Sequence, residues 1–354
     1  MRYTRAMFTP RGFIFGLIGL FIFAGGLFWI LVEANTPAPA GGPQPNALSL
    51  GSATSTAATS TAETFGSTTS SSSPTTLTIH TLPLGDGKVS SSPRVGFIYS
   101  CTPPSTSSSR VAASSSPWIH GAFWDATQKP TSGGRVFWPQ ASFSNVVQGA
   151  TRFVFGNGLP MNEPTGIFPV PLSDPSALYG RDTAGIQESS FSYALPANPI
   201  FAATPSCLPI NQPIGVTLDG VPLYSGVTSE GLDAGAHDVQ DLCGGRTDSH
   251  GQYYYSSLSS CIPHINGRNT VIGYARDGFP ITSLYDAQGK PYTNAALDAC
   301  HGTTAPITMG GKTVTMYHYV FTREYPYTLG CFRGSPVSNT PGLRPSSTAS
   351  STSP

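Results

Sequence analysis

One stretch of this chain occurs twice, and the repetition constrains the fold more than any other feature. Four landmarks recur in the same order: IGVTLDGVPL (214–223) as IGYARDGFPI (272–281), DLCGG (241–245) as DACHG (298–302), Tyr253-x-Tyr255 as Tyr317-x-Tyr319, and Cys261 as Cys331. Chance does not readily produce four landmarks in one order, so we infer an internal duplication of about 60–70 residues. We expect the two tandem units at about 210–265 and 268–334.

The composition narrows the class of protein. Charged residues make up 10% of the chain and the net charge is zero, whereas ordinary soluble chains carry about 25% charged residues. The sequence shows no basic stripe, so we expect no nucleic-acid partner. The 39 glycines and 33 prolines, with 15 tyrosines and 19 phenylalanines, are typical of a turn-rich β protein with an aromatic core.

The N-terminus indicates membrane insertion. Arginines precede an uncharged and largely apolar run at 12–32, which as a helix would measure roughly 31 Å and could span a bilayer. Signal-peptide cores are shorter, about 7–15 residues. We therefore expect residues 1–34 to be a cytoplasmic stub and an uncleaved single-pass anchor in the cell membrane, with the remainder extracytoplasmic. The alternative is cleavage after Ala34 or Ala40.

The rest of the chain divides by composition. Residues 35–76 are almost entirely Ser, Thr, Ala, Pro and Gly, which offer too little apolar area to offset the entropy of folding, so we expect a flexible stalk. Residues 335–354 have a similar composition and are expected to be a disordered tail. The folded exported region should therefore occupy 77–334.

Six cysteines follow the apolar run, and an even number in an exported chain favours disulfides. Each unit has an early and a late cysteine, so the duplication narrows the fifteen possible pairings. The expected pairs are Cys243–Cys261, Cys300–Cys331 and, as the remainder, Cys101–Cys207. A zinc site is the alternative, but the sequence has no paired CxxC motif.

Short strands and turns account for the folded region. Ile214, Val216 and Leu218 alternate up to an Asp-Gly, which is a hairpin signal that recurs at Asp277-Gly278. Pro222 follows directly, so the next strand is an edge strand or begins there. We predict a mainly β fold: two tandem related units, an aromatic-rich N-terminal β segment, and little helix apart from the anchor.

The closing sequence and its upstream markers resemble the YHYH domain family. The matching segments are MYHYVFTREYPYTLGCFRG (316–334), PWIHGAFWD (117–125), RVFWP (135–139), GNGLP (156–160), TGIFP (165–169), DGVP (219–222), DLCGG (241–245), DGFP (277–280) and LDAC (297–300). The resemblance covers roughly 95–334. It implies an exported protein without a settled activity, and the alternating Tyr and His suggest metal binding.

Several histidines of the family pattern are replaced here. Tyr254 and Ser256 stand where the first tetrad would have histidines, and Val320 ends the second. The acidic-Cys segment, which in the family ends in Gly-His, is followed by Arg246 and Thr303. These replacements weigh against an inherited histidine–metal site.

The duplicated positions supply most candidate site residues: Tyr253, Tyr255, Tyr317 and Tyr319, and the carboxylates Asp219, Asp277, Asp241 and Asp298. Tyrosines spaced i, i+2 share one face of a strand, where they line a pocket or pack in the core. His318, which lies between Tyr317 and Tyr319, would then be on the opposite face of the strand, in solvent or in a cleft. The aspartates are turn residues or, if the units pack about a pseudo-twofold axis, paired carboxylates that hold calcium.

The remaining candidates are cationic or metal-ligating. His250, His301 and His318 lie nearest the duplicated motifs and could hold a transition metal, although no HxH or HxxxH spacing supports this. Arg333 is either an anion clamp or the partner of a repeat aspartate in an ion pair.

These features suggest a cell-surface binding or structural module whose partner is a cell-wall or surface glycan or a protein, and whose binding surface should be an exposed aromatic groove. The alternative is a metal-dependent extracellular enzyme, an oxidoreductase or a hydrolase, with His301, His318 and the repeat carboxylates as its site. A third possibility is a divergent member that kept the fold and lost the ancestral site.

Overall fold

The computed structural model of the protein describes residues 81–105, 116–180 and 184–345. They fall within one compact unit, 72–354. The predicted anchor and stalk lie outside the described residues. Across the described ranges, no helix is long and apolar enough to cross a bilayer.

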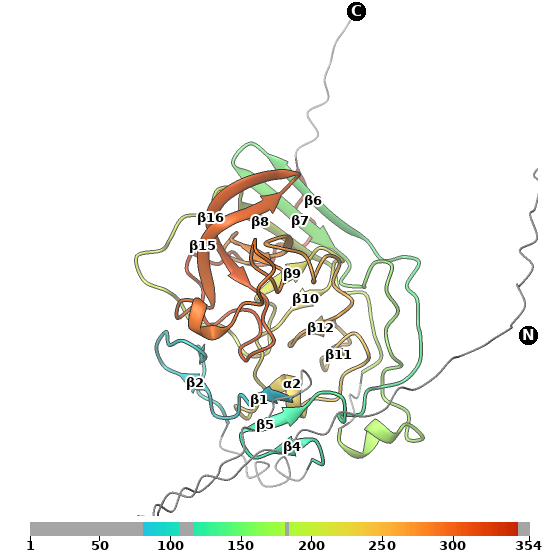
Figure 1. Ribbon diagram of the computed structural model, residues 1–354. Coiled ribbons are helices and arrows are strands. Elements are labelled where there is room, and N and C mark those ends of the chain that lie inside the picture. Colours follow the sequence, from blue (N-terminus) through green and yellow to red (C-terminus); the bar gives the residue numbers. More distant parts are fainter. Residues whose placement is uncertain (1–80, 106–115, 181–183, 346–354) are drawn as a thin grey trace, which may run out of the picture. The chain divides into compact units, whose positions relative to one another are not determined.

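The largest element is an eight-stranded mixed sheet, which runs through the middle of the domain (Figure 1). Its order is β11 (Gly245–Thr247), β12 (Tyr253–Tyr255), β10 (Pro222–Leu223), β9 (Gly215–Thr217), β13 (Val271–Ala275), β14 (Pro280–Thr282), β16 (Lys312–Val320) and β15 (Gly302–Met309). Helix is confined to α2 (Ala234–His237) and the 3₁₀ turns Pro175–Leu178 and Asn294–Ala296 among the described residues. The predicted mainly β fold is confirmed.

Asp-Gly turns produce the two inner hairpins. Gly220 has φ +87° and Gly278 has φ +88°, a region that glycine enters without a steric penalty. The first turn joins β9 to β10 in an antiparallel pair, and β10 begins at Pro222. Proline is tolerated as the first residue of a strand because it costs few ladder hydrogen bonds there.

The strand pairings on the two sides of the sheet correspond. At the centre β9 lies antiparallel to β13, with Val216 opposite Tyr274. Leu223 of β10 lies beside Tyr255 of parallel β12, and Ile281 of β14 lies beside Tyr319 of parallel β16. The outermost pairs, β11–β12 and β15–β16, are both antiparallel.

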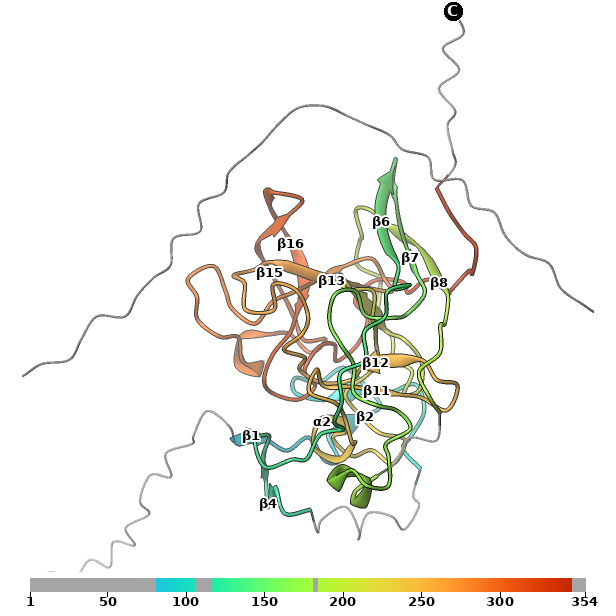
Figure 2. The same ribbon diagram turned by 90° about the vertical axis from the view of Figure 1, so that its right-hand side faces the viewer.

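A three-stranded sheet packs on one face of this large sheet near its centre. It consists of β6 (Phe143–Gln148), β7 (Thr151–Gly156) and β8 (Phe191–Pro196). Its buried side chains form one cluster with those of the large sheet: Val154, Phe191, Tyr193 and Leu195 with Val216, Val271, Tyr274 and Ile307. Figure 2 shows the two sheets from the side.

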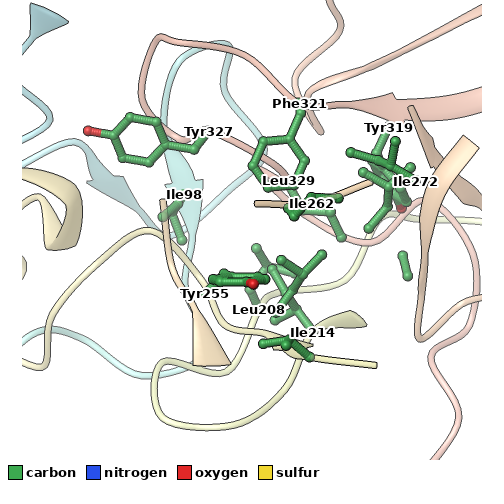
Figure 3. Close-up of a cluster of buried hydrophobic side chains, with 14 of the residues drawn as sticks. Ile98, Leu208, Ile214, Tyr255, Ile262, Ile272, Tyr319, Phe321, Tyr327 and Leu329 are labelled. Carbon is green, nitrogen blue, oxygen red and sulfur yellow. The ribbon is translucent and has the colours of Figure 1, made fainter. Parts of the chain in front are cut away.

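The other face carries the main core (Figure 3). Tyr255 and Tyr319 are fully buried there, together with Ile214 and Ile272. Leu208 and Ile98, which come from earlier in the chain, complete this cluster. The duplicated tyrosines therefore pack in the core, as one of the two predicted readings had it.

The N-terminal segment closes one end of the domain. β1 (Thr81–Pro83), β5 (Phe123–Asp125) and β4 (Ile119–His120) form a small sheet, and β2 (Val89–Ser90) pairs with β3 (Ile98–Tyr99). The Trp118 indole N–H donates to the carbonyl of Ala236 in α2 at 2.8 Å. This hydrogen bond and the burial of Trp118 attach the segment to the second half of the chain.

The C-terminal boundary differs from the prediction. Residues 335–345, predicted as disordered, lie along β8 and beside Arg276. Asn339 accepts a hydrogen bond from the Ser192 backbone N–H at 2.8 Å, and the Arg344 guanidinium lies 4.0 Å from the centre of the Phe155 ring. The composition of the segment does not predict this order, because backbone hydrogen bonds and a few side chains hold it in place.

The structure contains the three predicted disulfides, Cys101–Cys207, Cys243–Cys261 and Cys300–Cys331. No described cysteine is free. The bridges link residues 106, 18 and 31 positions apart, respectively. The long bridge joins the N-terminal segment to the large-sheet region, which makes its loop the largest.

Removing the long bridge should cost the most stability. In the chain-entropy model, a loop of about 100 residues contributes about 4–5 kcal/mol and one of about 15 residues about 3 kcal/mol. We therefore expect Cys101→Ser/Cys207→Ser to lower the free energy of unfolding more than Cys243→Ser/Cys261→Ser, as measured by urea denaturation. Equal losses, or the reverse order, would contradict this account.

Candidate functional site

The predicted aspartates and tyrosines meet in four hydrogen-bonded pairs. The donor–acceptor distances are 3.0 Å for Tyr255–Asp219, 2.6 Å for Tyr319–Asp277, 2.8 Å for Tyr253–Asp241 and 3.0 Å for Tyr317–Asp298. In every pair the phenol donates to the carboxylate. Each tyrosine comes from β12 or β16, and each aspartate from a turn.

The same carboxylates also hold their turns. Asp241 Oδ1 accepts from the backbone N–H groups of Cys243 and Gly245 at 2.9 and 3.0 Å, and Asp298 does the same for its own turn. The predicted turn role of these aspartates therefore matches their geometry. Each pair connects a turn to a strand in the interior, and most of its hydrogen-bonding capacity is already used.

Burial raises the pKa values of the carboxyl and phenol groups in this network. Asp219 is 1% exposed, and desolvation raises the pKa of its carboxyl to about 6, against the hydrogen bonds from Thr217 and Tyr255, which lower it. Burial likewise raises the pKa of Asp241 and Asp277, and that of the phenols of Tyr253, Tyr255 and Tyr319.

The predicted histidines do not come together as a metal site. His301 is buried, its Nε2 lies 2.9 Å from Thr322 Oγ1, and burial lowers its pKa to about 3. His318 is fully buried, with Nδ1 3.1 Å from the Met316 carbonyl. His250 is exposed. The described residues contain no group of three or more His, Cys, Asp or Glu side chains placed to hold a metal.

The expectation that His318 would face solvent or a cleft is wrong. Residues 314, 316 and 318 point to one face of β16 because side chains alternate along a strand. Val314 and Met316 pack against the cluster that the three-stranded sheet and the large sheet share, and His318 is itself fully buried, so this face of β16 is covered as well. The pattern of one strand cannot reveal a second layer.

Arg333 makes the ion pair that was one of its two predicted roles. Its Nε lies 3.6 Å from Asp298 Oδ2, and its guanidinium lies 4.3 Å from the centre of the Phe201 ring. Since the side chain is about a quarter exposed, the pair stabilises the fold only modestly.

A polar hollow that the sequence did not predict lies beside β11, and we call it the Arg246 pocket. Its volume is about 470 Å³, and its walls come from Asn211, Tyr224, Thr228, Ser229, Glu230, Asp238, Arg246, Thr247, Asp248, Ser249 and His250. Of the predicted site residues, only His250 lines it. The pocket presents hydroxyl, carboxamide, carboxylate, guanidinium and imidazole groups around one aromatic ring.

Internal contacts hold this wall in place. Arg246 forms an ion pair with Asp238. Tyr224 donates to Asp248 at 3.0 Å and stacks on Tyr254 with ring centres 4.0 Å apart. Arg246 lines the pocket and is opposite Tyr254 in the β11–β12 ladder. Both are positions where this chain departs from the histidines of the family pattern, and Tyr254 lies behind the pocket wall, stacked on Tyr224. That departure was the one sequence signal for the site.

Because Asp219 is desolvated, we expect the stability of the fold to depend on pH. Because its folded-state pKa is about 6 and the ordinary value is 3.8, the folded protein binds more protons than the unfolded chain between these values. Stability should therefore fall as pH rises from about 4 to about 6, by on the order of 3 kcal/mol from this group alone.

The variant Asp219→Asn should reduce that fall, measured by urea denaturation across the pH window, because it removes the buried charge. Glu188→Gln is the matched control, since Glu188 is exposed. An unchanged pH slope in Asp219→Asn would rule out Asp219 as a source of the effect.

Comparison with known proteins supports one relationship. The family model described as YHYH protein matches residues 192–294. No curated protein and no solved structure matches the chain. The matched segment contains β9 to β14, with Asp219, Asp241 and the Arg246 pocket. The resemblance to the YHYH family is thereby confirmed over residues 192–294, and the closing motif at 316–334 lies outside the matched segment.

Proposed function

We propose that this chain is a membrane-anchored surface protein whose YHYH domain binds a hydroxyl-rich ligand, a glycan of the cell wall or cell surface, in the Arg246 pocket. The observation that carries the proposal is the chemistry of that pocket. A volume of about 470 Å³ is within the range of small-molecule sites, roughly 300–1,000 Å³.

The lining suits sugar hydroxyls better than an apolar or strongly charged ligand. Hydroxyl groups act as both donor and acceptor, and the pocket offers both: the Asn211 carboxamide, the Ser249 hydroxyl and the His250 ring are all exposed there. Arg246 is paired with Asp238, so its charge is already balanced. The Tyr224 ring contributes an apolar surface.

The large sheet supports the proposed duplication and explains why one pocket is open. If residues 210–265 and 268–334 are repeats, Arg246 corresponds to Thr303 and Tyr254 to His318. The register agrees with this, since Arg246 is opposite Tyr254 and Thr303 is opposite His318. In the second unit His318 is fully buried, whereas the equivalent face of the first unit carries the Arg246 pocket.

Sequence features support the anchored location: arginines precede the apolar run 12–32, the Ser/Thr-rich segment 35–76 follows it, and the bonded cysteines come later. Disulfides persist mainly in oxidising compartments.

The proposed orientation makes a testable prediction. When protease is added to intact cells that express the full chain, cleavage should fall in the stalk 35–76 and release a disulfide-bonded fragment that extends to the C-terminus. The N-terminal stub should stay protected until the membrane is permeabilised. Cleavage that requires permeabilisation throughout would contradict an extracytoplasmic domain.

The binding site is tested by two exposed pocket residues. We expect His250→Ala and Asn211→Ala in the full chain to weaken retention on a wall-polymer and glycan array, each by about 2–10-fold, because each removes about one hydrogen bond. Stability should change by less than about 0.5 kcal/mol, as is usual at exposed positions.

The matched control is His120→Ala, since His120 is exposed and lies outside the pocket. It should bind as tightly as the natural sequence. No retention of any array component by the full chain would contradict glycan binding. Retention that survives both pocket variants would place the glycan at another surface.

A further inference from the structure

A single lysine is buried in the described part of the chain. Lys129 is 8% exposed, while Lys290 and Lys312 are exposed and Lys88 is half-buried. These four are all the lysines of the sequence. Burial of an ammonium group without a carboxylate partner costs free energy. The contacts of the Lys129 nitrogen therefore indicate whether the site favours the neutral amine or the ammonium form.

Both hydrogen-bond acceptors of Lys129 are neutral. Its Nζ donates to the Gly235 carbonyl at 2.6 Å and to Gln240 Oε1 at 3.1 Å. No carboxylate of the described residues forms an ion pair with it. A neutral amine has two N–H groups, which these two acceptors use completely, and it keeps a lone pair. An ammonium would have a third N–H left over.

The charges around Lys129 are mixed. Desolvation lowers the pKa of its amine to about 8, opposed by the carboxylates of Asp238 and Asp233 and reinforced by the Arg246 guanidinium. Asp238 is engaged with Arg246. The Trp124 ring centre lies 5.8 Å from Nζ.

Lys129 also lines a separate hollow of about 230 Å³, which we call the Lys129 pocket. Leu82, Trp124, Leu242 and Leu258 supply apolar walls, and the Lys129 side chain is the cationic group in the lining. The polar part of the lining is Thr131, Gln240, Asp241, Ser257 and Ser260, and the Asp241 carboxylate is already bonded to Tyr253 and to its own turn. It shares no lining residue with the Arg246 pocket. A lysine desolvated in a largely apolar pocket is an arrangement that activates an amine as a nucleophile toward carbonyl compounds.

We propose that Lys129 is a reactive amine that captures small apolar aldehydes as an imine in the Lys129 pocket. The Nζ lone pair attacks the carbonyl carbon and forms a C–N bond, and proton transfer from nitrogen to oxygen gives a carbinolamine. The hydroxyl then leaves as water, taking the second amine proton, and a C=N bond forms. The step is a condensation without net oxidation or reduction.

The test is reductive trapping on the oxidised full chain in detergent, with butanal as the probe and cyanoborohydride as the trapping hydride donor. Peptide mass spectrometry then quantifies the butyl group on each of the four lysines. At pH 7 we expect Lys129 to be modified about tenfold or more faster than the exposed Lys290 and Lys312, because only Lys129 has its amine in a desolvated pocket. Modification of the exposed lysines at an equal or higher rate would overturn the proposal.

A second variant tests the pocket itself. Leu258→Trp fills the Lys129 pocket, so trapping at Lys129 should fall by about tenfold or more while trapping at Lys290 is unchanged; circular dichroism checks that the variant is folded. If Lys129 in the folded variant is trapped as fast as before, the pocket does not deliver the aldehyde and the proposal fails. Glycan retention is measured on the same variant and should persist, because the Arg246 pocket is separate.

Discussion

The hydrogen bond between a buried phenol and a buried carboxylate is the interaction on which this sheet depends. Tyr255 donates to Asp219 and Tyr319 to Asp277, and each bond ties the Asp-Gly turn of a hairpin to the strand that pairs in parallel with it. The sequence of each hairpin does not by itself determine which strand pairs with it in parallel. An aspartate that lost its donor would leave buried charge unpaired, which costs about 1–3 kcal/mol or more.

Local chemistry made part of this fold predictable. The Asp-Gly turns, the strand that begins at Pro222 and the disulfide pairs all follow from residues near one another in sequence or from the repeated order. The three-stranded sheet did not, because β6, β7 and β8 cover the large sheet through side chains that no single strand pattern reveals. The burial of His318 also depends on packing over β16 that the alternation within one strand does not reveal.

The candidate site was harder to predict than the fold. The duplicated residues were the strongest candidates in the sequence. In the structure, however, Tyr253 donates to Asp241, and Asp241 also accepts from the backbone of its own turn, so the pair has a structural role. The walls of the Arg246 pocket come from separated segments, from Asn211 to His250. In the sequence, Arg246 is notable only because it replaces a histidine of the family pattern. Its ion pair with Asp238 forms only when the chain is folded, so the sequence could not reveal it.

One face of the large sheet therefore has different surroundings along its length. At the centre, Val216 and Tyr274 lie under the three-stranded sheet, and beyond them Ile307, Val314 and Met316 extend the same apolar cluster. At the other end, Tyr224 and Tyr254 stack beside a polar hollow. The outer pair β15–β16 therefore adjoins an apolar cluster, whereas the similar outer pair β11–β12 borders the polar Arg246 pocket. Under the proposed function, substitutions at the exposed residues of this pocket would alter binding with little cost in stability.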